Sequence, residues 1–160
     1  MGQSYWSTSG FGIDGNSLKI KKGLTLRKII ETLKSHGYEA DPRDILREDD
    51  YDDDMLDSED IEDILSDSEC EEHWLIGAYP FLMEWCARYI KDKHDIELDL
   101  LEDEDGDCYL MLCSAMPWDF TDEVKSLTAK SLTEMFNEGL ALFFEEEHNE
   151  PHLCTVRNFD

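Results

Sequence analysis

Apolar residues recur at helical spacing in three long stretches of the chain, which predicts three amphipathic helices. The first helix is expected over residues 25–36 and is closed by Gly37. Its inward-facing positions are Leu26, Ile29, Ile30 and Leu33. The second helix is expected over residues 80–94 and ends in basic residues, which suit the negative end of a helix dipole. The third is expected over residues 121–144, where Thr128 can also cap a separate helix.

Alternating patterns elsewhere predict β-strands. Residues 4–12 alternate aromatic and small polar side chains and end near the turn signal Asp14-Gly15. Residues 96–113 are predicted to form a β-hairpin, because an alternating strand, the tight-turn pair Asp105-Gly106 and an apolar strand follow one another. Residues 152–156 are expected to add an edge strand.

Together these elements predict an α+β fold in a single domain of residues 1–160. A small antiparallel sheet, made of the N-terminal strand plus the 96–113 hairpin, would be covered by three to four helices. The length suits one core, since a domain of this size buries about two thirds of its unfolded surface. The composition is 41% apolar and 11% aromatic, which is typical of a folded chain and not of a disordered one.

The segment 41–73 differs from the rest because it holds seventeen Asp and Glu against two Arg, a local charge of −15. Apolar residues nevertheless persist in it: Ile45, Leu46, Tyr51, Met55, Leu56, Ile61, Ile64 and Leu65. A purely solvated tail would not need them, so we expect a docked segment with acids on its outer face. Asp41 is predicted to cap a short helix over residues 42–47, and Asp57 or Ser58 a second helix ending near residue 66.

The chain as a whole carries a net charge of −26 at pH 7, whereas a small domain needs a net charge of only about 2 to 8 for solubility. Residues 1–40 sum to +3 and residues 95–107 to −8. The excess opposes compaction by self-repulsion, so we expect it to meet a basic partner surface. The predicted partner-binding carboxylates are Asp49, Asp50, Asp52, Asp53, Asp54, Asp57, Glu59, Asp60, Glu62, Asp63, Glu102, Asp103, Glu104 and Asp105.

Sequence motifs for catalysis are missing. The chain has no glycine-rich phosphate loop, no G-x-S-x-G elbow and no H-E-x-x-H pair. Carboxylates are so abundant that no particular pair indicates acid–base catalysis. We therefore expect no enzyme activity. Direct nucleic-acid binding is not expected either, because phosphates would be repelled by most of the molecule.

Ligand-like residues suggest two kinds of metal site. Asp50, Asp52 and Asp54 match the first three positions of a calcium loop, but Met55 and Ile61 stand where glycine and a bidentate glutamate are needed. Zinc is the better candidate cofactor, because thiol and imidazole ligands occur at ligand-like spacing. The candidate zinc ligands are Cys70, His73, His148, His152 and Cys154. The alternative is that these residues are surface histidines and structural cysteines.

The N-terminus and the cysteine count indicate a cytoplasmic protein. The first residues lack the basic start and apolar run of a signal peptide. No apolar stretch approaches the about 18 residues that a bilayer-spanning helix needs. The five cysteines are an odd number without framework spacing, which suits a reducing compartment. An anionic protein would also be repelled by anionic lipid, so no membrane partner is expected.

In its composition and its acidic segment 41–73, the chain resembles the acidic antagonists that bacteriophages and mobile elements use against host nucleases. Anti-CRISPR proteins and DNA-mimicking anti-restriction proteins form this class. The resemblance implies stoichiometric binding, in a bacterial host cell, to a nucleic-acid-accepting groove or another basic surface of an effector such as an RNA-guided nuclease. Two alternatives stay open: an immunity protein that neutralises a toxin, and a metal-binding or metal-stabilised interaction protein.

Overall fold

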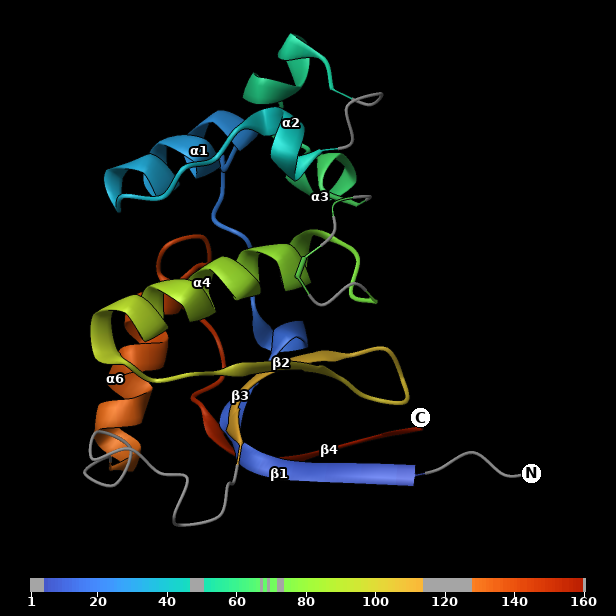
Figure 1. The fold of residues 1–160 in the computed structure, drawn as a ribbon, viewed down its shortest axis with the longest axis vertical. Helices are drawn as coiled ribbons and strands as arrows, with labels where there is room; N and C mark the ends of the chain where they lie inside the picture. The colour runs from blue at the N-terminus through green and yellow to red at the C-terminus, as the bar shows by residue number, and fades with distance from the viewer. Residues whose placement is uncertain are drawn as a thin grey trace.

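The computed structural model describes residues 5–46, 51–66, 68, 70–71, 74–113 and 128–159. It confirms the expected α+β class (Figure 1). In chain order the elements, with η for a 3-10 helix, are β1 (Tyr5–Asp14), η1 (Gly15–Ser17), α1 (Leu26–Ser35), α2 (Pro42–Ile45), η3 (Asp53–Asp57), α3 (Ile61–Ile64), α4 (Ala78–His94), β2 (Asp99–Glu102), β3 (Cys108–Cys113), α6 (Ala129–Leu140) and β4 (His152–Phe159).

The described elements form three tiers along the long axis of the molecule. Figure 1 shows the sheet at the bottom, α4 across the middle and α1, α2, η3 and α3 at the top, with α6 beside the C-terminal end of α4. The core runs through all three tiers. Its largest fully buried side chains are Phe136, Phe143, Phe144, Ile13, Leu26, Ile29, Leu33, Leu65, Leu82, Met83, Ile90 and Ile96.

The four strands form one antiparallel sheet in the order β2-β3-β1-β4. The predicted N-terminal strand and hairpin are its first three members. The predicted edge strand is β4, which pairs with β1 from Tyr5 opposite Phe159 to Gly12 opposite His152. The earliest and latest described segments of the chain therefore lie side by side.

The sheet curls so far that its two outer strands meet at one end. The backbone N–H of Glu104, just after β2, donates to the carbonyl oxygen of Arg157 in β4 at 2.8 Å. The side-chain amide of Asn158 donates to the carbonyl oxygen of Glu102, also at 2.8 Å. These bonds fix the hairpin turn against the C-terminal half of β4.

Two glycines in β1 permit the curl. A Cβ atom added to Gly10 or Gly12 would collide with the backbone of β3. On the same face of the sheet as these glycines, Met111 and Val156 are 0% and 1% exposed. Alternate residues of a strand point to opposite faces, so the curled sheet encloses an apolar interior separate from the core under α4.

Local signals define α1 and the start of α6 as expected. Thr25 caps α1 by accepting the backbone N–H of Lys28 at 3.2 Å, and Gly37 follows the helix with φ 86°. Thr128 caps α6 and forms a capping box with Ser131. The separate helix predicted at Thr128 is confirmed, while residues 121–127 lie outside the described residues.

The predicted end of this helix at residue 144 is wrong, because α6 ends at Leu140. The chain turns there and places two phenylalanines against the segment before α1. The carbonyl oxygen of Phe143 accepts the N–H of Lys21 at 3.0 Å, and Phe144 forms a β-bridge with Ile20. This pairing is distant in sequence, so helical periodicity alone gave no sign of it.

The acidic segment contains shorter helices than the pattern predicts. A single helix from Asp57 or Ser58 to about residue 66 is wrong, since η3 and α3 are separate and α3 spans only Ile61–Ile64. Asp57 is bonded to Arg27 instead of capping a helix. The Ser58 hydroxyl accepts the N–H of Asp60 at 3.2 Å.

Apolar side chains of residues 41–66 lie in the core. Asp41 caps α2, as predicted, by accepting the N–H of Arg43 at 2.9 Å. The buried apolar residues of this stretch are Ile45, Leu46, Ile61 and Leu65. Their burial holds the surrounding carboxylates at the surface of the upper tier.

Candidate interaction surface

The carboxylates predicted to bind a partner fall into two sets. Asp49 and Asp50 lie outside the described residues. The first set surrounds η3 and α3, and all its described members are exposed: Asp52, Asp53, Asp54, Asp57, Glu59, Asp60, Glu62 and Asp63. In the second set, at the hairpin, Glu104 and Asp105 are exposed, whereas Glu102 and Asp103 are half-buried.

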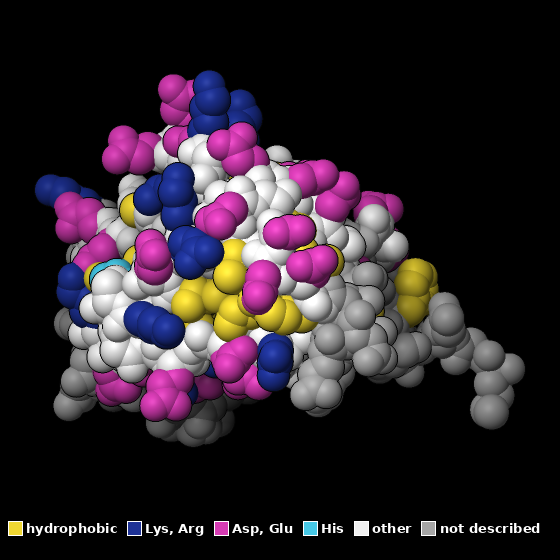
Figure 2. Space-filling model, turned by 90° about the horizontal axis from the view of Figure 1, so that it is seen from above, with side chains coloured by type: hydrophobic (Ala, Val, Ile, Leu, Met, Phe, Trp, Pro, Cys, Tyr) yellow, Lys and Arg dark blue, Asp and Glu magenta, His cyan; other side chains and the backbone are white. Residues whose placement is uncertain are grey.

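The surface of the upper tier is mixed in sign. Figure 2 looks down on this face and shows Asp and Glu side chains with Lys and Arg side chains among them and apolar surface between. Residues 51–66 contain no Lys or Arg, so the bases come from elsewhere in the chain, such as Arg27 of α1. The charge of the segment in sequence therefore overstates the charge of the face that it helps to form.

The clearest example is the ion pair between Arg27 of α1 and Asp57 at the end of η3. The guanidinium donates to both carboxylate oxygens, at 2.8 and 3.2 Å. Hydrogen bonding to Arg27 holds the pKa of Asp57 below its usual value. Asp57 thus ties the acidic segment to α1 and is already paired within the chain.

We expect the substitution Asp57→Asn to lower stability slightly, as is usual for an exposed ion pair, and in a pH-dependent way. A carboxylate whose pKa is lowered by folding stabilises the protein above its unfolded pKa of about 3.9, and this contribution is lost as the pH falls through the folded pKa. Urea midpoints of wild type and variant should differ by a constant amount above about pH 5 and converge below about pH 3. An equal difference in urea midpoint at all pH values would contradict the role of the Arg27–Asp57 pair. The control is Asp54→Asn, which removes a carboxylate outside this pair.

Other carboxylates of the first set interact with their own neighbours. Asp52 caps η3 by accepting the N–H of Asp54 at 3.1 Å. A hydrogen bond with Asp60, together with charge repulsion from it, raises the pKa of Asp63. Neutralising either member of that pair relieves repulsion, so the charged pair does not stabilise the fold.

In the second set, Asp103 shapes the hairpin turn. Its carboxylate accepts the N–H of Asp105 at 3.0 Å and that of Asp107 at 2.8 Å, which is the pattern of an Asx turn. Gly106 completes the turn with φ 86°. Asp103 is therefore a structural residue, and Glu104 and Asp105 form the exposed acidic edge.

A depression of about 350 Å³ lies at the hairpin turn and the start of α4. Its lining comes from η1, the start of α4 and the hairpin turn: Gly15, Asn16, Leu18, Ile76, Gly77, Ala78, Tyr79, Pro80, Gly106, Asp107 and Cys108. The Tyr79 hydroxyl donates to Glu62 of α3 at 3.1 Å, and Asp107 belongs to the hairpin turn. The depression is therefore linked to the first set by the Tyr79–Glu62 hydrogen bond and to the hairpin turn, which carries the second set, by Gly106 and Asp107.

Sequence reasoning missed two exposed apolar residues at this place. Ile76 lines the depression and is 52% exposed, and Trp74, two residues earlier, is 51% exposed. A signal was present, since Trp74, Leu75 and Ile76 are three successive large apolar residues directly after an acidic stretch. They match neither a helical nor a strand pattern, and such patterns were the basis of the prediction.

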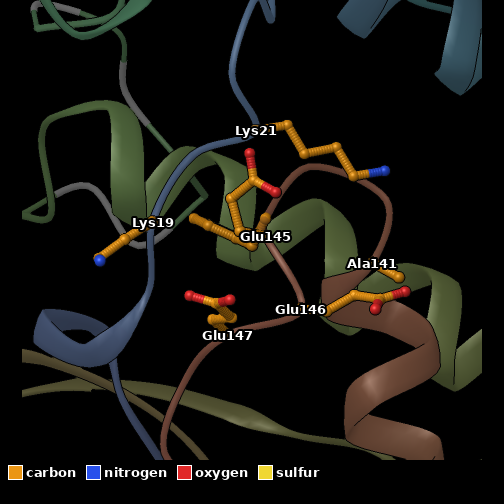
Figure 3. A pocket seen from close by; sticks show the side chains of 7 residues that line it. Lys19, Lys21, Ala141, Glu145, Glu146 and Glu147 are labelled. Atoms are coloured by element: carbon orange, nitrogen blue, oxygen red, sulfur yellow. The ribbon is translucent and has the colours of Figure 1, made fainter.

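A second depression, of about 470 Å³, lies where the segment before α1 runs beside the segment after α6 (Figure 3). Its charged lining residues are Lys19, Lys21, Glu145, Glu146 and Glu147. The Glu145 carboxylate accepts the N–H of Lys22 at 2.7 Å, and the amines of Lys19 and Lys21 point apart. The basic N-terminal segment is thus met here by acids of its own chain.

The structure does not bring the described candidate zinc ligands together. Among the described residues, no three His, Cys, Asp or Glu side chains gather as metal ligands, and His73 lies outside those residues. The buried Cys70 thiol donates to the carbonyl oxygen of Leu75 at 3.3 Å. His148 and His152 each place Nδ1 against a nearby backbone carbonyl, at 2.8 and 3.0 Å.

Burial favours the protonated state of four thiols. Burial raises the pKa of Cys154 and, together with a hydrogen bond to Asp99, raises that of Cys113 to about 12. Burial likewise raises the pKa of Cys86 and Cys108. A zinc ligand is a thiolate, and Cys154 is the one of these four cysteines that is a candidate ligand. Zinc binding by the candidate ligands stays a prediction.

Comparisons of the chain with protein-family models, with curated proteins and with solved structures find no match. In the part of the chain that the structure describes, no helix is long and apolar enough to cross a bilayer. The arrangement of the surface residues is therefore the basis for a functional proposal.

Proposed function

We propose that the protein is a stoichiometric inhibitor that binds a basic, nucleic-acid-accepting surface of a host defence nuclease, such as an RNA-guided nuclease. It acts in the bacterial cytoplasm, catalyses no reaction and does not contact nucleic acid itself. The observation that carries this proposal is the exposure of acids around η3 and α3 and, as Glu104 and Asp105, at the hairpin turn. One depression borders that turn and is linked to α3 by the Tyr79–Glu62 hydrogen bond.

The acids support this function by electrostatics. Duplex DNA carries one charge per about 1.7 Å of axis, and proteins that bind it line their grooves with Lys and Arg. A rigid protein with carboxylates at its surface competes for the same groove. Complementary charge mainly speeds association, and salt screens it over a Debye length of about 10 Å at 0.1 M.

The experiment measures association of the protein with a guide-loaded RNA-guided nuclease across a salt series. The fourfold variant Asp54→Asn, Glu59→Gln, Asp60→Asn and Asp63→Asn removes four exposed carboxylates of the first set. We expect its association rate at low salt to fall by about tenfold, because electrostatic steering raises association rates by about 10 to 1,000-fold. Thermal stability should stay the same or rise, since the repulsion between Asp60 and Asp63 is relieved.

A matched control changes the net charge by the same amount elsewhere. Glu134, Glu146, Glu147 and Glu150 are exposed residues outside both sets, and their joint change to Gln should leave the association rate nearly unchanged. If both fourfold variants bind as fast as wild type, the first acidic set has no part in the mechanism. Duplex DNA is added as a competitor, and intact DNA loading in the presence of bound protein would rule out occlusion.

A further inference from the structure

Trp74 and Ile76 are exposed apolar residues two positions apart, and Ile76 lines the depression at the hairpin turn. Both side chains are just over half exposed, whereas Leu75 between them is 3% exposed. The chain therefore turns the middle residue into the core and the two flanking side chains outward. Exposed apolar residues are common when isolated, but these two lie within three residues of each other, and Ile76 also lines the depression.

The loop that carries Trp74 and Ile76 is fixed from inside. The carbonyl oxygen of Leu75 accepts the Cys70 thiol at 3.3 Å, and the N–H of Gly77 donates to the carbonyl oxygen of Ser68 at 3.3 Å. Ser68 is 1% exposed and Cys70 is 5% exposed. Two exposed apolar side chains held on an anchored loop lose little conformational entropy on binding, which favours their use as anchors.

The surroundings of Ile76 are acidic. The lining of the depression that Ile76 enters includes Asp107 and no Lys or Arg. Glu62 borders it through the Tyr79 hydroxyl, and the exposed edge of the hairpin turn adds Asp105. An apolar centre with a charged rim is the usual anatomy of a protein interface.

We infer that Trp74, Ile76 and the adjoining depression form a docking site for an apolar side chain that a basic segment of the partner presents. The inference rests on the proposed function and names the chemistry that the partner must offer there. Charge selects this occupant, because a second copy of the chain would bring another acidic rim and a further net charge of −26. Trp residues dominate binding energy at interfaces and mainly slow dissociation.

The test uses a small probe in place of the full partner. The probe is an acetylated, amidated peptide with a Leu-Phe pair between two pairs of lysines, and its match has Ser-Ser in place of Leu-Phe. Binding to the full chain is followed by the indole NMR resonances, with Trp74→Phe assigning the signal of Trp74 among the four tryptophans. We expect the Trp74 signal to shift saturably and the Ser-Ser peptide to bind about tenfold more weakly.

Three variants complete the test. Trp74→Ala and Ile76→Ala should each weaken the Leu-Phe peptide by about tenfold at both low and high salt. Leu153→Ala removes a side chain of β4 that is 82% exposed and should have no effect. Equal binding of both peptides, or equal loss in Leu153→Ala, overturns the docking site. If the peptide results overturn the docking site while the nuclease still binds with the expected salt dependence, the proposed function rests on charge alone. If the peptide docks but no nuclease binds, the proposed function fails instead.

Discussion

Replacing Gly12 by alanine should destabilise the protein by about 3 kcal/mol, near the upper end of the usual range for single substitutions. The added Cβ would collide with the carbonyl oxygen of Leu110 and lie 2.6 Å from Cγ and 2.7 Å from Cα of Met111. Backbone atoms cannot yield without separating β1 from β3. The free energy of unfolding, measured by urea denaturation, tests this expectation.

The matched control is Ser7→Ala, which changes an exposed residue of the same strand. We expect it to alter stability by at most about 0.5 kcal/mol. If Gly12→Ala were equally mild, the close approach of β1 and β3 that produces the curl of the sheet would be wrong.

Truncation of Phe136 to alanine should cost about 3 to 5 kcal/mol, as is typical for a buried phenylalanine. Phe136 of α6 is 1% exposed and meets Phe11 of β1 edge to face, with ring centroids 6.1 Å apart. This contact joins the last described helix to the sheet, so its loss leaves a cavity between two elements. A total stability of about 5 to 15 kcal/mol is usual, and much of it would be lost.

Urea denaturation and thermal melting measure this loss, and Phe159→Ala is the control. Phe159 is 44% exposed at the end of β4, so we expect its truncation to cost much less. If Phe136→Ala costs as little stability as Phe159→Ala, α6 contributes little to the core.

The elements that sequence reasoning predicted well are those whose signals are local. Thr25 and Gly37 bound α1, and Thr128 begins α6, because capping bonds form between near neighbours. The hairpin likewise depends on a turn whose residues interact among themselves. In each case the structure is determined within a few positions of the residues that signal it.

The elements that sequence reasoning missed depend on distant partners. The segment after α6 leaves the helix because Phe143 and Phe144 pair with the segment before α1. The acidic segment acquires a positive neighbour because Arg27 reaches Asp57 from another helix. The sequence gives the number of charges but not which of them share a surface.

The candidate site divides in the same way. The exposure of the predicted carboxylates around η3 and α3 follows from their type and could be expected. Their arrangement about a depression could not, because the hairpin turn and the start of α4 come together only through the core. Trp74 and Ile76 gain their significance from that same arrangement.

The pairing of β1 with β4 has a consequence for how the protein is made. Residue 5 finds its partner only at residue 159, and contacts between such distant positions slow folding. On the ribosome, β1 emerges first and keeps one edge unpaired until β4 has been synthesised. The bond from Glu104 to Arg157 forms in the same step. A partly synthesised chain therefore carries the acids but lacks the contacts of β4 with the hairpin turn, and the complete acidic surface forms only after translation has passed β4.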